Sequence, residues 1–469
     1  MVVFGKPLQV EQTAIPGLVI LDLPVHGDAR GWFKENWQRE KMVALGLPDF
    51  LPVQNNISFN DAVGTTRGIH AEPWDKFVSV ASGSVFGAWA DLREGPTFGT
   101  TFTAQIDPSR AIFVPRGVGN SYQTLEPDTA YTYLVTDHWS PDASYTFLNL
   151  ADETAAIEWP IPLNAAEISV KDLNHPSLRD VSPMPGRRIL VIGSAGQLGR
   201  ALQAEFAGDD SVEFATRDTL DLVRADLETA RHWRDYSLII NAAAYTAVDD
   251  AETAEGREKA WAVNAVAVAR LARVAAANGI TLVHLSSDYV FAGTREGAYT
   301  ELDALTPLGV YGQSKAAGDV AASIAPRHYV LRTSWVVGEG RNFVRTMAEL
   351  ASRGVSPSVV DDQRGRLTFA SDIARAIRHL VTVNAPFGVY NVSCSGDVMS
   401  WADVAREVFD LVGADSARVR ASSTSAYYAD AERVIAPRPR NSALDLSKIE
   451  GTGFVPRDGL AALRAYITT

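Results

Sequence analysis

The sequence predicts two domains, an all-β jelly roll followed by an α/β unit built on a doubly wound parallel sheet. The chain has 469 residues, which is too long for one ordinary domain. Short alternating apolar runs fill its first part, and strand–helix alternation fills its second part. Residues 176–187, with three prolines and a glycine, separate the two sequence patterns. We therefore expect domains at 1–178 and 188–469, joined by a linker at 179–187.

Composition limits the classes of function. The net charge of -13 argues against a general nucleic-acid binder, which needs a basic face. The single cysteine, Cys394, excludes an internal disulfide and fits a reducing compartment. The first residues have no long apolar core and no cleavage site, so we expect no secretory leader, and no apolar run reaches the ~18–20 residues of a membrane span. We expect a cytoplasmic protein with no membrane and no nucleic-acid partner.

The first domain reads as short strands separated by turns. Turn residues at Ser82-Gly83 and Pro115-Arg116-Gly117 separate the apolar runs, as in a sandwich or jelly roll. Residues 39–45 form one of its few helical stretches. The expected strands cover residues 17–21, 77–81, 85–90, 111–114 and 130–135.

The second domain begins with a strand, a glycine-rich turn and a helix. Gly193, Gly196 and Gly199 have the spacing G-x-x-G-x-x-G, which lets the backbone approach a pyrophosphate at a helix N-terminus. Such turns also occur for packing alone, but this one opens a series of alternating strands and helices. The expected strands are 189–192, 238–240, 282–285 and 329–331, and the expected helices are 196–206, 258–278 and 311–324. This pattern indicates a Rossmann-type fold.

Arg217 follows the second strand of this unit, where an acidic residue would hold the ribose 2′-hydroxyl of NAD. An arginine there can accept a 2′-phosphate, so the sequence favours NADPH over NADH. A solvated surface arginine is the other interpretation, and the choice of cofactor stays open.

Tyr311 and Lys315 are four residues apart, which places both side chains on one face of a helix. A nearby ammonium favours the phenolate, so we expect it to lower the pKa of Tyr311 and make the phenol a general acid. Ser287 follows a buried strand and can bond the same carbonyl oxygen. Together with the glycine turn, the three residues predict a hydride-transfer site that protonates a ketone.

Five segments of the second domain resemble the dTDP-4-dehydrorhamnose reductases, which are extended short-chain dehydrogenase/reductases. They are residues 241–249, 286–291, 311–315, 331–336 and 438–442. The resemblance runs from about residue 188 to the end of the chain. It implies Ser287, Tyr311 and Lys315 as the catalytic set, with serine in place of the more usual threonine, and a small substrate-binding lobe. Some members need Mg²⁺, although no carboxylate cluster argues for it here.

The resemblance also implies ligand contacts. The cofactor would meet Gly193, Gly196, Gln197, Leu198, Gly199, Arg217, Ala242, Ala243, Ala244, Tyr311 and Lys315. The sugar nucleotide would meet Thr246, Val248, Trp335 and Asn441, and the basic pair Arg438 and Arg440 suits its diphosphate.

His70 invites a comparison of the first domain with the metal-binding cupins. Those domains supply an H-x-H pair, but Ala71 and Glu72 follow His70, so we expect no metal. A structural strand histidine is the alternative interpretation. A catalytic role for His70 is favoured by the residues that accompany it in the sequence, Arg67, Lys76, Tyr133 and Asp152.

Those residues belong to segments that resemble the dTDP-4-dehydrorhamnose 3,5-epimerases. The segments are residues 28–35, 54–56, 67–70, 91–93, 96–99 and 152–160, within a match over about 8–175. The resemblance implies a cupin-like jelly roll with His70 as the base, Asp152 as its orienting partner, Lys76 against the enolate oxygen and Tyr133 as the acid. It places Arg30, Glu35, Gln54, Asn56, Arg67 and Asn120 around the nucleotide sugar.

Two departures fall at this expected pocket. Asn120 stands where the family generally has histidine, and the loop from His70 to Lys76 is short. They leave open whether both carbons are epimerised.

The sequence thus predicts a bifunctional enzyme that takes a dTDP-linked 4-keto-6-deoxyhexose. It would epimerise C3 and C5 and then reduce the C4 ketone to give dTDP-L-rhamnose. The alternatives are C5-only epimerisation, opposite C4 stereochemistry, a non-catalytic regulatory subunit, or an active reductase carrying a sugar-nucleotide-binding scaffold. By resemblance we expect a homodimer formed through the epimerase domain.

Overall fold

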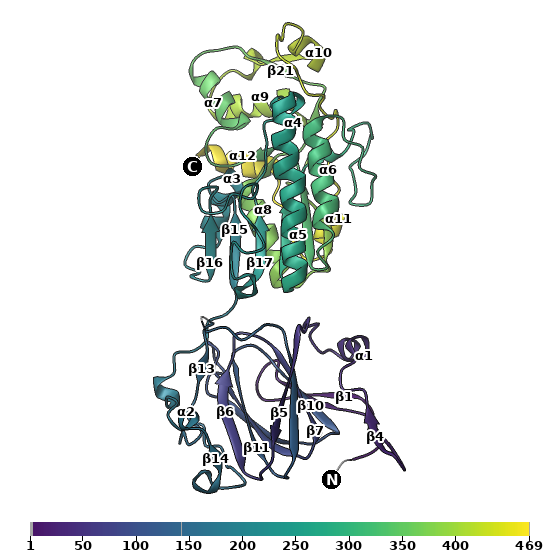
Figure 1. Cartoon of the computed structure of the whole chain (residues 1–469). Helices are drawn as coiled ribbons and strands as arrows, with labels where there is room; N and C mark the ends of the chain where they lie inside the picture. Colours follow the sequence, from purple (N-terminus) through teal and green to yellow (C-terminus); the bar gives the residue numbers. More distant parts are fainter. Residues whose placement is uncertain (1–2, 142, 469) are drawn as a thin grey trace. The chain divides into compact units, whose positions relative to one another are not determined.

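The computed structural model describes residues 3–141 and 143–468, and its contacts divide the chain into two compact units, Met1–Gly186 and Arg187–Thr469 (Figure 1). The first unit is rich in strands and the second mixes strands and helices, as predicted. Each unit has its own hydrophobic core, so each is described by itself.

Two sheets make up the first unit. One has the strand order β1-β2-β10-β7-β12-β5 and the other β13-β6-β11-β8-β9, with β14 pairing to β6. Their pairings are antiparallel except that of β14. The first sheet contains β1 (Gln9–Gln12), β2 (Val19–Asp22), β5 (Gln54–Asn60), β7 (Lys76–Ser82), β10 (Arg110–Val114) and β12 (Thr129–Val135). The second contains β6 (Thr65–Ala71), β8 (Val85–Asp91), β9 (Thr101–Ile106), β11 (Val118–Thr124), β13 (Thr146–Phe147) and β14 (Glu167–Ile168).

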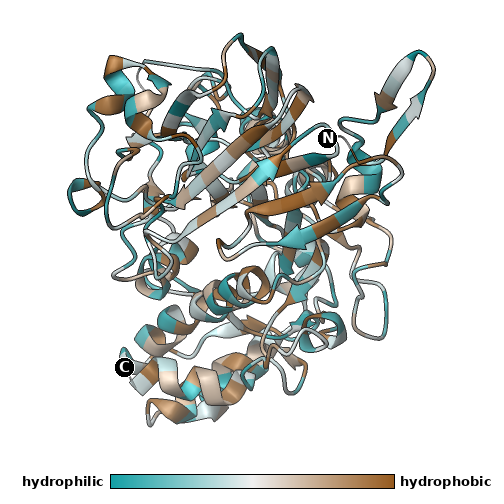
Figure 2. Cartoon of the chain, turned by 90° about the horizontal axis from the view of Figure 1, so that it is seen from below, coloured by the Kyte–Doolittle hydropathy of each residue, from teal (hydrophilic) through white to brown (hydrophobic). Residues whose placement is uncertain are grey.

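A hydrophobic core joins the inner faces of these two sheets. Val78 and Val80 of β7 contribute from one side, and Trp89 of β8 and Val118 of β11 from the other. Because successive side chains of a strand point to opposite faces, this packing fixes the register of each strand. Figure 2 shows hydrophobic and hydrophilic residues alternating along several of the strands. The outer face of the first sheet packs against α1 (Arg39–Ala44) and the residues just after it. The sequence predicted a helix at residues 39–45.

The remaining elements of the first unit lie at its edges. β3 (Val25–Asp28) and β4 (Gly31–Lys34) form a hairpin of their own. The short helices are η1 (Leu163–Ala165), α2 (Val170–Leu173) and η2 (Leu178–Asp180). Part of the segment expected to be a linker packs here, because Met184 is buried and its backbone pairs with Leu92 and Glu94.

The second unit is organised around a parallel sheet with the order β16-β15-β17-β18-β19-β24. Its strands are β15 (Arg188–Ile192), β16 (Val212–Ala215), β17 (Tyr236–Asn241), β18 (Thr281–Leu285), β19 (His328–Thr333) and β24 (Gly388–Val392). The four strands expected from sequence are among them. Parallel strands need crossover connections, and the helices that supply them cover both faces of the sheet.

Two hydrophobic clusters show which helices cover which face. One face packs against α3 (Gln197–Glu205) and α8 (Ala370–Thr382), and the other against α5 (Ala267–Asn278) and the end of α6 (Val310–Ala322). α4 (Ala254–Trp261) and η5 (Ala262–Val266) lead into α5 as one helix. This helix, Ala254–Asn278, is apolar and long enough to cross a membrane, but half of its most apolar window is buried within the unit, as in a core helix.

A third cluster lies apart from the main sheet and gathers α7 (Phe343–Ser352), α9 (Trp401–Leu411) and α12 (Gly459–Thr468). The short strand pairs near it are β20 (Val336–Val337) with β23 (Thr368–Phe369), β21 (Ser358–Val360) with β26 (Arg420–Ser422), and β22 (Arg364–Gly365) with β25 (Met399–Ser400). The remaining short helices are η3 (Trp233–Asp235), η4 (Asp250–Glu252), η6 (Asp288–Val290), η7 (Ser416–Arg418), α10 (Thr424–Tyr427) and α11 (Ser447–Glu450).

Candidate active sites

The first unit contains a cavity of about 530 Å³ that is lined by residues of β6, β7, β11 and β12. Its lining is polar and aromatic, which suits a sugar nucleotide better than an apolar ligand. The lining residues that matter below are Arg67, His70, Glu72, Lys76, Asn120, Tyr131, Tyr133 and Asp172. Five of the residues predicted from sequence therefore meet at one cavity: Arg67, His70, Lys76, Asn120 and Tyr133.

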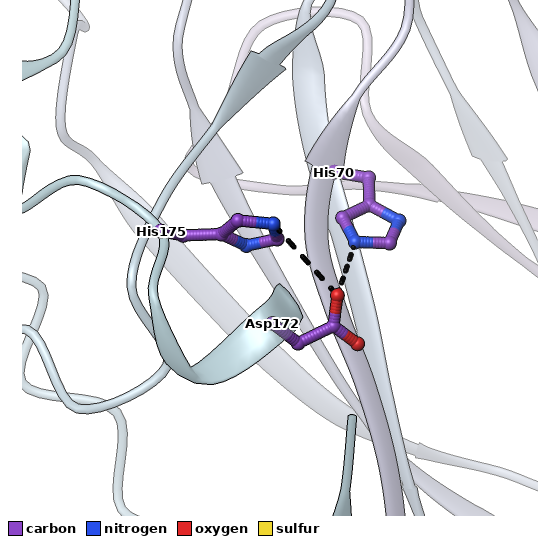
Figure 3. A group of neighbouring side chains, drawn as sticks. All are labelled: His70, Asp172 and His175. Atoms are coloured by element: carbon purple, nitrogen blue, oxygen red, sulfur yellow. Dashed lines mark hydrogen bonds and ion pairs between the residues drawn. The ribbon is translucent and has the colours of Figure 1, made fainter. Parts of the chain in front are cut away.

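His70 of β6 is oriented by Asp172. Its Nε2 lies 2.9 Å from Asp172 Oδ1, and Asp172 itself is buried in α2 (Figure 3). Ser169 caps this short helix by accepting from the backbone N–H of Asp172 at 3.1 Å. A carboxylate bonded to one ring nitrogen fixes the tautomer of histidine and leaves the other nitrogen to act as a base.

The expectation that Asp152 orients His70 is wrong. Asp152 accepts hydrogen bonds from the backbone N–H groups of Thr154 and Ala155 through Oδ1 and of Leu178 through Oδ2, at 2.9, 2.8 and 2.7 Å. Both oxygens are thus committed to a turn and to the neighbouring chain. Asp172 could not be found from sequence, because its partner His70 lies 102 residues away and spacing does not reveal such a pair.

Lys76 and Tyr133 form the other catalytic pair expected at this cavity. Lys76 is buried and its ammonium is paired with Glu72, a residue that the sequence argument missed. The nearby carboxylate offsets the cost of burying the charge. The Lys76 ammonium also lies 5.9 Å from the ring centroid of Tyr133. Burial, with a smaller contribution from Glu72, raises the pKa of Tyr133, so its phenol keeps its proton at neutral pH.

Asn120 of β11 stands directly opposite His70 of β6 in the strand pairing. Its Oδ1 accepts from Trp89 Nε1 at 2.9 Å and from the Tyr131 hydroxyl at 3.0 Å. These bonds fix the amide, so its NH₂ group is the remaining donor. Asn120 can therefore bond a ligand in the cavity, but an amide does not exchange protons as a histidine does.

The other expected nucleotide ligands do not line this cavity among the residues that the structure describes. Arg30, with 90% of its side chain exposed, pairs with Asp28 in the β3–β4 hairpin, and Glu35 pairs with Lys41. Gln54 and Asn56 of β5 bond each other at 2.7 Å. Arg30 and Glu35 therefore do not reach the cavity of their own chain.

The second unit holds the glycine turn between β15 and α3. Gly193 has a φ of +81° and a Cβ there would lie 2.7 Å from Ala243 N, while a Cβ at Gly199 would lie 2.4 Å from Gly193 O. Gly196 is the N-cap of α3 and supplies no capping side chain, so the first N–H groups of the helix can meet an anion. Gln197 and Leu198 open that helix. A dinucleotide pyrophosphate fits this turn.

The other cofactor residues surround the turn. Ala242, Ala243 and Ala244 directly follow β17, and the Ala242 N–H bonds Ile192 O at 3.0 Å. Arg217 follows β16, the strand next to β15, and its side chain is exposed and ion-paired with Asp221 at 3.4 Å.

Ser287, Tyr311 and Lys315 are brought together and are all buried. Ser287 ends the turn after β18 and donates to Asp288 Oδ1 at 3.0 Å, while Lys315 donates to the carbonyl of Leu285. Burial raises the pKa of Tyr311 to about 12, although hydrogen bonding to Ser287 lowers it. Burial also lowers the pKa of Lys315 to about 8. The expected lowering of the Tyr311 pKa is therefore wrong, because burial outweighs the hydrogen bond with Ser287.

Asp288 is a buried acid that the sequence argument did not single out. Burial raises its pKa to about 6 even though Ser442 and Ser287 bond it. Ser287 donates to Asp288 and accepts from the backbone N–H of Tyr289 at 3.2 Å. These two bonds hold its hydroxyl in place beside Tyr311.

The four residues expected to contact the sugar nucleotide in this unit lie in different environments. Val248 packs with Tyr289 and Tyr311, and Trp335 stacks on Trp401 with ring centroids 3.7 Å apart. Thr246 is exposed two residues before Val248. Asn441 donates to the carbonyls of Arg295 and Gly297 at 2.8 and 2.9 Å, so its amide holds a neighbouring loop.

Arg438 lines a pocket of about 250 Å³ with Tyr289, Trp401, Tyr427 and Tyr428. Its guanidinium donates to Asp249 at 2.8 Å and lies 5.1 Å from the Tyr428 ring. Arg440 lines a separate polar cavity of about 690 Å³ with Arg295, Arg364 and Arg366.

Comparison with known proteins assigns both units to families. Residues 187–469 match the RmlD substrate binding domain, and residues 12–180 match the dTDP-4-dehydrorhamnose 3,5-epimerase family. An RmlC homolog of Streptococcus pyogenes serotype M6 is 50% identical over 39% of this chain and 95% of its own length.

The second unit has relatives that are named as ketoreductases. A probable dTDP-4,6-dihydroxy-2-methyloxan-3-one 4-ketoreductase of Streptomyces antibioticus is 40% identical over 59% of this chain and 93% of its own length. The dTDP-4-dehydrorhamnose reductase of Aggregatibacter actinomycetemcomitans is 36% identical over 60% and 99%.

Among solved structures, the dTDP-4-dehydrorhamnose reductase of Bacillus anthracis str. Ames in complex with NADP is 29% identical, with a TM-score of 0.54. The match covers 60% of this chain and 99% of that one. The chain therefore belongs to the RmlD family through its second unit and to the dTDP-4-dehydrorhamnose 3,5-epimerase family through its first, and it is a bifunctional epimerase and reductase of dTDP-rhamnose biosynthesis.

Proposed function

We propose that the cavity of the first unit epimerises C3 and C5 of dTDP-4-dehydro-6-deoxy-D-glucose with His70 as its base. Protons beside a ketone are acidic, so the free nitrogen of His70 can remove them while Asp172 holds the ring. The enolate oxygen at C4 is stabilised by the Lys76 ammonium. Tyr133, whose pKa burial raises, returns a proton to the carbon from the opposite face. The observation that supports this assignment best is the His70–Asp172 pair beside Lys76 at one cavity.

The second site then reduces the C4 ketone to give dTDP-L-rhamnose. The phenol of Tyr311, with its pKa near 12, carries the proton for the ketone oxygen, and Ser287 bonds the same oxygen. Lys315, with its pKa near 8, is an ammonium at neutral pH and stabilises the phenolate that forms.

A nicotinamide dinucleotide fits the turn at Gly193, Gly196 and Gly199, and when bound it supplies the hydride. Ala242, Ala243 and Ala244 would lie beside it. The NADP in the related Bacillus anthracis reductase favours NADPH, with exposed Arg217 as the residue that can meet its 2′-phosphate.

The epimerase unit pairs with a second copy through β5. Ser58 of this edge strand lines the cavity, whereas Ile57 and Phe59 point outward and are 68% and 57% exposed. A second copy would cover them, and it would bring hairpin residues such as Arg30 to a cavity that they do not reach in their own chain. A cytoplasmic location fits the free thiol of Cys394.

The assignment is tested by supplying dTDP-4-dehydro-6-deoxy-D-glucose in D₂O with NADPH or NADH. The expected product is dTDP-L-rhamnose with deuterium at C3 and C5, and its NMR spectrum separates it from the products of C5-only epimerisation or opposite reduction. Tyr311→Phe should keep the exchange and stop reduction. His70→Ala should stop NADPH consumption from this substrate but leave the reverse oxidation of dTDP-L-rhamnose intact. Loss of exchange in Tyr311→Phe would show that the two sites are not separate.

A further inference from the structure

A third side chain, His175, lies beside the catalytic pair of the first unit. It follows α2 and approaches the same oxygen of the Asp172 carboxylate as His70 does, with the centroids of the two imidazole rings 5.2 Å apart (Figure 3). Its Nε2 is 3.8 Å from Asp172 Oδ1, the same oxygen that His70 Nε2 approaches to 2.9 Å. The three ligand-capable atoms lie within 4.8 Å of one another.

The placement of His175 needs an explanation. Only 5% of its side chain is exposed, and the ring of Phe147 stacks on it with centroids 4.7 Å apart. Within the described chain, its Nε2 has no hydrogen-bond partner, since 3.8 Å to the carboxylate is too long for one. A buried polar atom without a partner costs about 1–3 kcal/mol, so such atoms are rare unless they have another role.

Two imidazoles and a carboxylate are the ligands that Zn²⁺ accepts while leaving a coordination position open. Metal–ligand bonds of about 2.0–2.2 Å in a tetrahedron place neighbouring ligand atoms roughly 3.3 Å apart. The two distances to Asp172 Oδ1, 2.9 and 3.8 Å, lie on either side of that value. The open position would face the cavity, because His70 and Asp172 line it.

We propose that His70, Asp172 and His175 form a binding site for Zn²⁺ or a similar divalent transition metal, and that metal binding switches off epimerisation. The metal would take the nitrogen through which Asp172 orients His70 and would break that pair. The switch, though not the site, rests on the proposed role of His70 as the base. The sequence has no H-x-H pair at His70, which is why we expected no metal in this domain. In the structure the second histidine is His175, which lies near the other end of the domain in sequence.

The first test measures binding to the full-length chain after treatment with a chelator. Calorimetric titration with ZnCl₂ and the visible absorption of bound Co²⁺ should show a site in the wild type. His175→Gln should weaken Zn²⁺ binding at least about tenfold, since loss of even an outer partner of a ligand costs that much. His26→Gln, which changes an exposed histidine of β3, should bind as the wild type does. The absence of bound metal, or equal binding by His175→Gln, would overturn the site.

The second test compares deuterium exchange at C3 and C5 with and without Zn²⁺ within each variant, so that differences in basal activity cancel. Exchange should stop with Zn²⁺ in the wild type, return on adding EDTA, and persist with Zn²⁺ in His175→Gln. Reduction of the already epimerised ketone should be unaffected and serves as an internal control. Thermal unfolding of His175→Gln and His175→Asn shows whether each folds. Binding that depends on His175 without any effect on exchange would overturn the role of His70 as the base and leave the site standing.

Discussion

Asp172 determines how His70 can act. Its Oδ1 holds one ring nitrogen at 2.9 Å, and its own backbone is fixed by the Ser169 cap at 3.1 Å. Because the carboxylate is buried, its interaction with the ring is stronger than it would be in water. A short capped helix thus orients His70, the proposed base, which lies on a different element.

Replacing Asp172 with asparagine should lower the rate of exchange at C3 and C5 by at least about 100-fold. The amide keeps the shape but no longer stabilises the imidazolium or selects its tautomer. Deuterium incorporation followed by NMR measures the loss. The matched control is Asp152→Asn, which should keep the exchange but lower the free energy of unfolding by about 1 kcal/mol, because the oxygen that accepts from Leu178 N–H becomes an NH₂ group. The opposite pattern would restore Asp152 as the partner of His70.

The reductase residues make a prediction about pH. Burial lowers the pKa of Lys315 to about 8, so its ammonium is present below that pH and lost above it. Tyr311, with a pKa raised to about 12, stays protonated throughout. The rate of reduction of pre-epimerised ketone should therefore fall as the pH rises through about 8, and stopped-flow measurement of NADPH oxidation records it. A rate that stays level to pH 10 would remove Lys315 from the step.

At the scale of elements, the turn from β15 to α3 leaves no room for a side chain at Gly193 or Gly199. A Cβ at Gly199 would lie 2.4 Å from Gly193 O and 2.5 Å from Ser194 atoms. The backbone contact is tight because the helix must begin close to the strand end to present its N–H groups. The close approach of α3 to the end of β15 therefore requires glycine at both positions 193 and 199.

Gly199→Ala should weaken NADPH binding about tenfold or more, because overpacking by one methyl group costs ~1–3 kcal/mol. Quenching of tryptophan fluorescence on adding NADPH measures the affinity. Gly186→Ala is the control, since nothing lies within 4 Å of the added methyl. Unchanged affinity in Gly199→Ala would place the cofactor elsewhere.

The elements were largely predictable, but the partners of the site residues were not. Periodicity predicted the helix that carries Tyr311 and Lys315 and the strands on either side of it. It could not choose between Asp152 and Asp172, because both are distant in sequence from His70 and only the packing of α2 decides. The predicted direction of the Tyr311 pKa shift was wrong for a similar reason, since burial depends on how the whole unit packs.

At the scale of the whole molecule, β5 reverses the usual pattern of an edge strand. Its outward side chains include Ile57 and Phe59, whereas exposed edges are normally kept short, charged or covered. An uncovered apolar edge promotes association, so the proposed pairing of epimerase units follows from this strand.

Changing Ile57 and Phe59 together to lysine should convert the proposed dimer into monomers, since each charge would be buried without a partner in the interface. Light scattering coupled to gel filtration measures the mass. Leu302→Lys, at a side chain 96% exposed in the second unit, is the control and should leave the mass unchanged. If the double variant stays dimeric, the interface lies on another surface.

The division of the chain after Gly186 has an evolutionary consequence. All residues proposed for the first site precede this position and all those proposed for the second follow it. A genetic recombination there would exchange one complete activity for another without dismantling either catalytic set. One such event would change the stereochemistry of the dTDP-linked deoxysugar that the fused enzyme makes.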